Sequence, residues 1–259
     1  MTMKLICPIC KEALQQINKS AVCANHHTFD YAKQGYLNLL IRQSVDHGDN
    51  AAMVKARTAF LNTGSYAFLR QRLCEIMQAN PHEVLADLGC GEGYYTSAFP
   101  AKEKYGFDMS REALRHAART DHSTQYAVAS IFHLPLPESS CDIAVTCFAP
   151  FAKGEIERIL KKNGIFIFVT PGPRHLFEMK EAVYETPYEN EMKDLDTKME
   201  VIQDEMIENQ FTLDQDQLFA LFMMTPYAHR TREEDREKLK KYSSLTLTAQ
   251  FRIRVYKNL

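Results

Sequence analysis

The chain has 259 residues, of which 45% are apolar and 25% charged, a composition ordinary for a soluble globular protein. No apolar run approaches the roughly 18 to 20 residues that span a bilayer, and the N-terminus lacks the features of a secretory signal. The net charge of −2 does not indicate a nucleic-acid binder, although residues 1–57 carry +3 and the remainder −5, as expected if the front faced a polyanion.

Three segments of different character follow one another along the chain. Residues 1–36 hold too few apolar side chains for a core of their own and are predicted to form a small module. Residues 37–57 are predicted as a linker, in which the polar stretch SVDHGDN is expected to be mobile. Residues 58–259 are predicted to form the main domain. Seven cysteines without a secretory signal indicate free or metal-bound thiols, and hence a cytoplasmic protein.

Residues 53–79, which run from the end of the linker into the main domain, show helical spacing interrupted at Gly64. Strands and helices then alternate. The predicted strands are VLADL, KYGFD, QYAVAS, CDIAVTCF and IFIFVTP, and the predicted helices are EGYYTSAF, SREALRHAART with Ser110 as N-cap, and GEIERILKKNG ended by Gly164. Continuous apolar strands between helices predict an α/β fold with a parallel, Rossmann-like sheet. Residues 199–213 and 244–258 alternate with period two and are predicted as an antiparallel pair at the sheet edge.

A glycine-rich loop, DLGCGEG, follows the first of these strands and is predicted to open a helix. It contains Asp87, Gly89, Gly91, Glu92 and Gly93. Glycines allow a tight turn close to a ligand, and a helix N-terminus adds partial positive charge. Asp108 ends the next strand, where a carboxylate can accept hydrogen bonds from the ribose hydroxyls of an adenosine.

The loop favours one cofactor over another. A dinucleotide site usually reads GxGxxG and holds a pyrophosphate, which the carboxylate of Glu92 would repel. S-adenosylmethionine carries a sulfonium and an ammonium group and no phosphate, so it is compatible with Glu92. The residues therefore favour S-adenosylmethionine over NAD as the cofactor. A nucleophilic Cys147 is conceivable, but no neighbouring signature supports it.

The first 36 residues contain a second motif, in which Cys7-x2-Cys10 and Cys23-x3-His27 are separated by twelve residues. This spacing is close to that of a zinc finger, and four protein ligands leave no position for water. The site is therefore predicted to be structural, with Zn²⁺ stabilising a module too small to fold alone. Spacing favours His27 over His26 as the fourth ligand.

The segments CPIC…CANHHTFDYAKQGYLNLL, ARTAFLNTGSY, DLGCGEGYYT and TPGPRHL, in this order, resemble the RlmA family of 23S ribosomal RNA guanine-N1 methyltransferases. The resemblance implies a zinc-binding RNA-recognition module joined to a class I S-adenosylmethionine-dependent methyltransferase domain. The implied substrate is a guanine in a hairpin of 23S rRNA that lines the peptide exit tunnel beside the macrolide site. The resemblance also implies that the cofactor is contacted by Tyr66, the loop from Gly89 to Tyr94, Asp108 and His175. It implies the same four zinc ligands as the spacing.

Three functions stay open on the sequence. The first is rRNA methylation, with a possible homodimer that would widen the RNA cleft. The second is methylation of a small molecule, with a zinc module that only stabilises the fold. The third is a non-enzymatic zinc-binding adaptor, against which the intact glycine loop and Asp108 argue. No general base is identified, because residues 147–152 contain no Asp or Glu.

Overall fold

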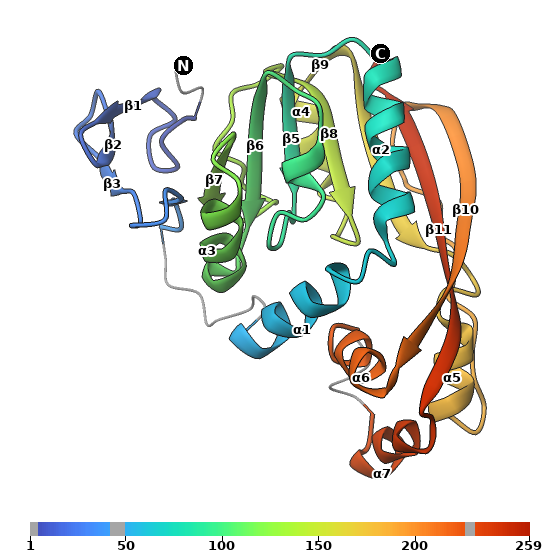
Figure 1. Ribbon diagram of the computed structural model, residues 1–259. Helices are drawn as coiled ribbons and strands as arrows, with labels where there is room; N and C mark the ends of the chain where they lie inside the picture. The colour runs from blue at the N-terminus through green and yellow to red at the C-terminus, as the bar shows by residue number, and fades with distance from the viewer. Residues whose placement is uncertain (1–4, 42–49, 226–230) are drawn as a thin grey trace.

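The computed structural model describes residues 5–41, 50–225 and 231–259. It contains a three-stranded sheet near the N-terminus and an eight-stranded sheet flanked by helices (Figure 1). The elements in chain order are β1 (Leu14–Ile17), β2 (Ser20–Cys23), β3 (Thr28–Asp30), β4 (Leu37–Asn38), α1 (Ala51–Leu61), α2 (Ala67–Ala79), β5 (Val84–Leu88), η1 (Thr96–Ala98), β6 (Glu103–Asp108), α3 (Arg111–Thr120), β7 (Thr124–Val128), β8 (Cys141–Cys147), α4 (Lys153–Ile159), β9 (Leu160–Pro171), α5 (Phe177–Val183), β10 (Glu200–Asp214), α6 (Gln215–Met223), α7 (Glu233–Glu237), η2 (Lys238–Lys241) and β11 (Ser244–Lys257).

The large sheet has the strand order β10-β11-β9-β8-β5-β6-β7-β4. The predicted strands β5 to β9 pair in parallel, while β11 runs antiparallel to β9 and β10 antiparallel to β11. The chain leaves β5 toward β6 and returns on the other side as β8, so the order reverses between β5 and β8. Ligands of such sheets bind at the carboxyl ends of the strands beside this reversal. The predicted α/β fold and the edge pair are confirmed.

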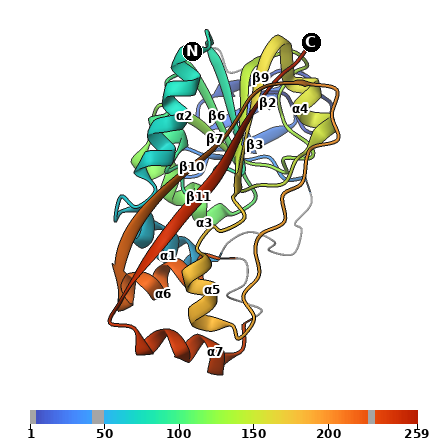
Figure 2. The same ribbon diagram turned by 90° about the vertical axis from the view of Figure 1, so that its right-hand side faces the viewer.

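Two apolar layers cover the sheet, one on each face. Along β9, Ile165, Ile167 and Val169 enter one layer, and Phe166 and Phe168 enter the other. Helices α2, α5 and α6 contribute to the first layer and α4 to the second. Figure 2 shows α2 and α4 on opposite sides of the sheet. The continuous apolar strands of the sequence are explained by burial on both faces.

The N-terminal module, residues 5–36, is joined to the large sheet. Strand β4 pairs in parallel with β7, and the Ile6 N–H donates to the Pro135 carbonyl at 3.0 Å. Leu5 and Leu14 are buried in the same layer as Phe166. The sheet therefore covers apolar surface that the module could not bury alone.

The predicted linker, residues 37–57, differs from expectation at both ends. Its start forms β4 in the sheet, and its end forms the first turns of α1, where the Asn50 side chain accepts the Met53 N–H. Residues 44–49 of the SVDHGDN stretch lie outside the described residues. A two-residue strand is too short to show periodicity, so its pairing partner was not predictable from pattern.

Two predicted helices are corrected. Residues 92–99 form only the short 3-10 helix η1, because Gly91 and Gly93 have φ values of +54° and +80°, which an α-helix cannot contain. The loop is thus followed by a turn, and the expected α-helix dipole is absent there. Helix α4 ends at Ile159 and not at Gly164, because Leu160 already pairs with Cys141 as the start of β9.

Other local predictions are confirmed. Gly64, at φ +79°, lies between α1 and α2, and the Ser110 side chain accepts the Ala113 N–H at the start of α3. Within the described residues, none of the helices has the length and apolar character that crossing a bilayer requires.

Candidate zinc and cofactor sites

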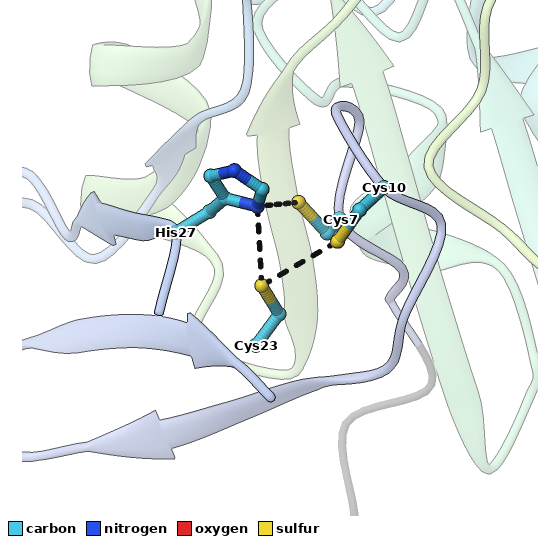
Figure 3. A group of neighbouring side chains, drawn as sticks. All are labelled: Cys7, Cys10, Cys23 and His27. Atoms are coloured by element: carbon cyan, nitrogen blue, oxygen red, sulfur yellow. Dashed lines mark hydrogen bonds between the residues drawn. The ribbon is translucent and has the colours of Figure 1, made fainter. Parts of the chain in front are cut away.

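The four predicted zinc ligands converge in the N-terminal module. Their ligand atoms all lie within 4.8 Å of one another (Figure 3). His27 Nδ1 lies 3.5 Å from Cys7 Sγ and 3.4 Å from Cys23 Sγ, and Cys10 Sγ lies 3.6 Å from Cys23 Sγ. Around a tetrahedral zinc with Zn–S bonds of about 2.3 Å, sulfur ligands lie about 3.8 Å apart. Three sulfurs and one imidazole at these separations fit Zn²⁺ with all four positions filled by protein.

The choice between the adjacent histidines follows from the backbone. His26 has φ +62° and an exposed side chain, and its N–H donates to the Cys23 carbonyl at 2.9 Å. This tight turn directs the next side chain, that of His27, toward the cysteines. The Glu12 backbone N–H is the main group that lowers the pKa of the Cys10 thiol, to about 6, which favours the thiolate that a metal binds. The choice of His27 from spacing agrees with this geometry.

The glycine loop lies at the carboxyl end of β5 and touches the loop after β8. A Cβ atom added to Gly89 would lie 2.5 Å from Ala149 Cβ, and one added to Gly93 would lie 2.6 Å from Tyr126 Oη. Both glycines also have positive φ values. Contact and backbone conformation together exclude a larger residue at either position. The absence of side chains lets the backbone of the loop lie close to the crevice between β5 and β8.

Asp108 holds this loop in place. Its Oδ2 accepts the Gly91 N–H at 2.9 Å, and its Oδ1 accepts the Ser110 N–H at 2.8 Å. A carboxylate acts only as an acceptor when ionised, and here both oxygens face backbone N–H groups at the ends of the two strands. Asp108 therefore links the carboxyl ends of β5 and β6.

Asp87 is a buried carboxylate beneath the loop, with 2% of its surface exposed. Its Oδ2 accepts the Thr96 hydroxyl at 2.5 Å, whereas its Oδ1 is buried with no hydrogen-bond partner among the described residues. Burial raises the pKa of Asp87 to about 7, against the smaller lowering effect of Thr96. An unmatched buried carboxylate oxygen is stabilised by a nearby cation.

Glu92, predicted as a loop carboxylate compatible with a cationic cofactor, is paired with α1. Its Oε2 lies 3.1 Å from Arg57 Nη1, and 4% of the Glu92 side chain is exposed. The same Arg57 atom lies 3.1 Å from a Cβ added to Gly91. Helix α1 thus lies over the loop. Its arginine was not identified from the sequence, because no local motif distinguishes Arg57 from a surface cation.

Tyr66 and His175, 109 residues apart in the chain, are hydrogen-bonded. His175 Nδ1 accepts the Gln250 N–H at 3.2 Å, so the neutral ring carries its proton on Nε2 and donates it to Tyr66 Oη at 3.2 Å. Burial lowers the pKa of His175 to about 3, which keeps the ring neutral near neutral pH. Both rings contact Phe251, at centroid distances of 4.9 and 4.7 Å.

Tyr94 and Tyr95 differ although they are adjacent. The Arg70 guanidinium lies 4.4 Å above the Tyr94 ring, beside a cavity of about 160 Å³ that Tyr94 also lines. Tyr95 is 9% exposed, and its hydroxyl is buried with no hydrogen-bond partner within the described part of the chain. The sequence identified Tyr94 and missed Tyr95, whose buried hydroxyl lies near the glycine loop.

Comparison with known proteins identifies both parts of the chain. Residues 5–44 match the zinc-ribbon family model described as RlmA, N-terminal, and residues 86–168 match a methyltransferase domain. A 23S rRNA (guanine(748)-N(1))-methyltransferase of Streptomyces fradiae is 37% identical over 69% of this chain and 67% of its own length. A Micromonospora griseorubida protein, assigned by name as a 23S rRNA (guanine-N(1)-)-methyltransferase, is 32% identical over 69% of each chain. The chain belongs to the RlmA family of 23S rRNA (guanine-N1)-methyltransferases.

Solved structures agree on the fold of the RlmA methyltransferase domain. A Bacillus halodurans protein described as a methyltransferase superposes with a TM-score of 0.51, at 14% identity over 73% of this chain and 98% of its own. A protein from Anaeromyxobacter dehalogenans, titled as a type II methyltransferase, gives 0.52 at 18% identity, over 73% and 95%. At these identities the likeness shows the fold alone.

Membership in the RlmA family decides between the functions considered above. The protein is an rRNA methyltransferase, which excludes the non-enzymatic adaptor. Methyltransferase domains of this fold take their methyl group from S-adenosylmethionine, and the buried Asp87 oxygen beside the glycine loop fits its cationic groups. The zinc ribbon holds Zn²⁺ through the four ligands of the N-terminal module. Burial raises the pKa of Cys147 well above that of a free thiol, which disfavours the thiolate that a nucleophile would need.

Proposed function

We propose that this enzyme transfers a methyl group from S-adenosylmethionine to N1 of a guanine in a hairpin of 23S rRNA that lines the peptide exit tunnel. The observation that carries the proposal is the coexistence of the family's zinc ribbon and the glycine loop in one chain that shares 37% identity with a guanine-N1 methyltransferase. The name of that relative specifies guanine 748, which favours methylation of the equivalent guanine by this enzyme. The cytoplasm, where ribosomal RNA is found, is the proposed location.

The cofactor contacts are assigned from the geometry of the loop. Asp108 accepts the ribose hydroxyls, and the backbone of Gly89, Gly91 and Gly93 approaches the methionine portion closely. The unmatched oxygen of Asp87 and the carboxylate of Glu92 provide negative charge near the ammonium and sulfonium groups. Tyr94 and the Tyr66–His175 pair border the site. Both rings of the pair pack against Phe251, which positions them there.

The chain's own residues have a limited chemical task. When bound, the cofactor supplies an electrophilic methyl group on a sulfonium. Guanine N1 carries a proton and becomes nucleophilic only as that proton leaves. The protein must take the base out of its pair and place N1 in line with the methyl, which is largely a matter of positioning. A carboxylate or water that receives the proton is not assigned.

The zinc ribbon is proposed to grip the RNA hairpin while the α/β domain performs the transfer. Supporting this division, the ribbon has a closed ligand set and is fixed to the sheet through β4. A homodimer would extend the RNA-binding surface across two copies, and sedimentation velocity at several protein concentrations tests for it.

Primer extension tests the proposed function. Large-subunit RNA is incubated with enzyme and cofactor, and reverse transcription is expected to stop one nucleotide before the guanine equivalent to 748, because a methyl on N1 blocks base pairing. RNA without cofactor is the control. A methylated guanine at another position would overturn the assignment of the site, and absence of any methylated RNA would overturn the function.

A further inference from the structure

The segment that follows β8, residues 148–152, contains two phenylalanines near the crevice between β5 and β8. Phe148 and Phe151 differ sharply in their surroundings. The Phe151 ring stacks on Phe166 at 5.6 Å and lies 6.3 Å from Phe168, within the apolar layer on one face of the sheet. Phe148 is 42% exposed. Its ring rests on the other layer's edge, at 5.3 Å from Phe251 and 6.4 Å from Tyr95.

Phe148 also has an unusual backbone. Its φ is +67°, in the left-handed region, which a bulky non-glycine residue rarely adopts. The Phe148 N–H donates to the Val169 carbonyl at 3.1 Å, so pairing with β9 continues through the strained residue. A strained residue at the carboxyl edge of the sheet, with its aromatic ring exposed to solvent, is an observation that points to a function of that ring.

The Phe148 ring packs on two buried rings on one side and is exposed to solvent on the other. Phe251 is fully buried, and Tyr95 is 9% exposed, so the two rings beneath Phe148 cannot themselves stack on a substrate. Tyr66, another aromatic at this edge, is 2% exposed and is likewise inaccessible. Next to Phe148, Ala149 contacts Gly89 of the cofactor loop. An aromatic face beside the loop is therefore presented by Phe148 and not by Phe251, Tyr95 or Tyr66.

We infer that Phe148 is the surface on which the target guanine stacks after it leaves the RNA duplex. The inference rests on the proposed function and names the subsite for the reacting base. A purine extruded from a duplex loses its stacking neighbours, and an aromatic side chain replaces them. The left-handed backbone holds the ring in the crevice before the base arrives. Phe148 is thus a substrate-binding residue that sets the plane of the base relative to the methyl donor.

Four single variants separate stacking from packing. Phe148→Tyr keeps the aromatic face and is expected to retain activity within about threefold. Phe148→Leu and Phe148→Asn remove it, and asparagine tolerates the left-handed backbone. Base–aromatic stacking of the usual strength predicts that kcat/KM for RNA methylation falls about 10- to 100-fold in both. Phe151→Leu is the matched control, with a lower melting temperature and a kcat/KM within about threefold of wild type.

A second readout excludes a purely structural role. S-adenosylmethionine binding, measured by calorimetry, is expected to stay within about twofold of wild type in Phe148→Asn. If wild-type enzyme methylates the guanine and Phe148→Leu and Phe148→Asn do so equally well, the stacking role is wrong while the proposed function stands. Loss of cofactor binding together with activity in Phe148→Asn would also overturn it. If wild-type enzyme methylates no RNA, the proposed function itself fails.

Discussion

Arg57 of α1 and Glu92 of the glycine loop form an ion pair at 3.1 Å between residues 35 positions apart. The Glu92 side chain is 4% exposed and that of Arg57 is 20% exposed, so the carboxylate depends on nearby positive charge. The helix that follows the zinc ribbon is thereby attached to the glycine loop.

Breaking the Arg57–Glu92 pair should destabilise the protein more than removing it. Arg57→Met leaves a buried carboxylate without its guanidinium, which costs about 3 kcal/mol in the free energy of unfolding. In Arg57→Met combined with Glu92→Gln the stranded charge is gone, so much of the stability should return. Urea unfolding of the two single variants and the double variant measures the coupling. Equal stability of Arg57→Met and the double variant would show that the Glu92 charge has no cost once Arg57 is gone.

The two adjacent histidines of the zinc ribbon should respond oppositely to the same substitution. His27→Asn removes a ligand and is expected to lower bound zinc below one per chain, reduce the melting temperature and abolish RNA methylation. S-adenosylmethionine affinity should change less than about threefold, since the loop lies in the other domain. His26→Asn, at an exposed left-handed position that asparagine tolerates, should resemble wild type. Metal analysis, thermal unfolding and the two assays are compared. Full RNA methylation by zinc-free protein would contradict the assigned division of labour.

Cofactor affinity should depend on pH through Asp87. Its folded pKa is about 7, so the carboxyl is largely neutral at pH 6 and ionised at pH 8. A cationic ligand binds the ionised form better, so S-adenosylmethionine affinity should rise by up to about tenfold between these pH values. Asp87→Asn should bind weakly with a flat profile. Thr96→Val, which removes a hydrogen bond that lowers this pKa, should move the rise to higher pH. Calorimetry from pH 6 to 8.5 follows all three, and a flat wild-type profile would refute the assignment.

Acid should destabilise the fold through His175. Its folded pKa of about 3 lies below the usual value of 6.5, so the unfolded chain binds the extra proton. The stabilisation is present above pH 6.5 and is lost as the pH falls toward 3, with a slope of at most about 1.4 kcal/mol per pH unit. Asp87 contributes in the opposite sense, so the informative quantity is the difference between wild type and His175→Gln. That difference should shrink from pH 7 to pH 5. A constant difference would mean that His175 titrates normally.

Local pattern predicted much of this molecule. The boundaries of β5, the N-cap Ser110 and the zinc ligands depend on residues close together in sequence, where spacing alone determines which side chains share a face or a metal. The helix expected over residues 92–99 did not form as predicted because Gly91 and Gly93 have positive φ values, and the side chains that leave room only for glycine there, Arg57 and Tyr126, are distant in the chain. Arg57 and Tyr95 were missed for the same reason. Their burial, pairing and backbone conformation exist only once β5, β8 and α1 have come together.

Strand β4 fixes the distance between the zinc ribbon and the glycine loop. Because Leu37 and Asn38 are hydrogen-bonded to the sheet that also carries Asp108, the ribbon and the cofactor loop are parts of one rigid frame. Under the proposed division of labour, the span between the ribbon that holds the hairpin and the crevice where its base reacts is fixed by backbone geometry. A hairpin with a stem one base pair longer would carry its guanine past the crevice. Which nucleotide is modified would thus be decided by distance as much as by the identity of the base.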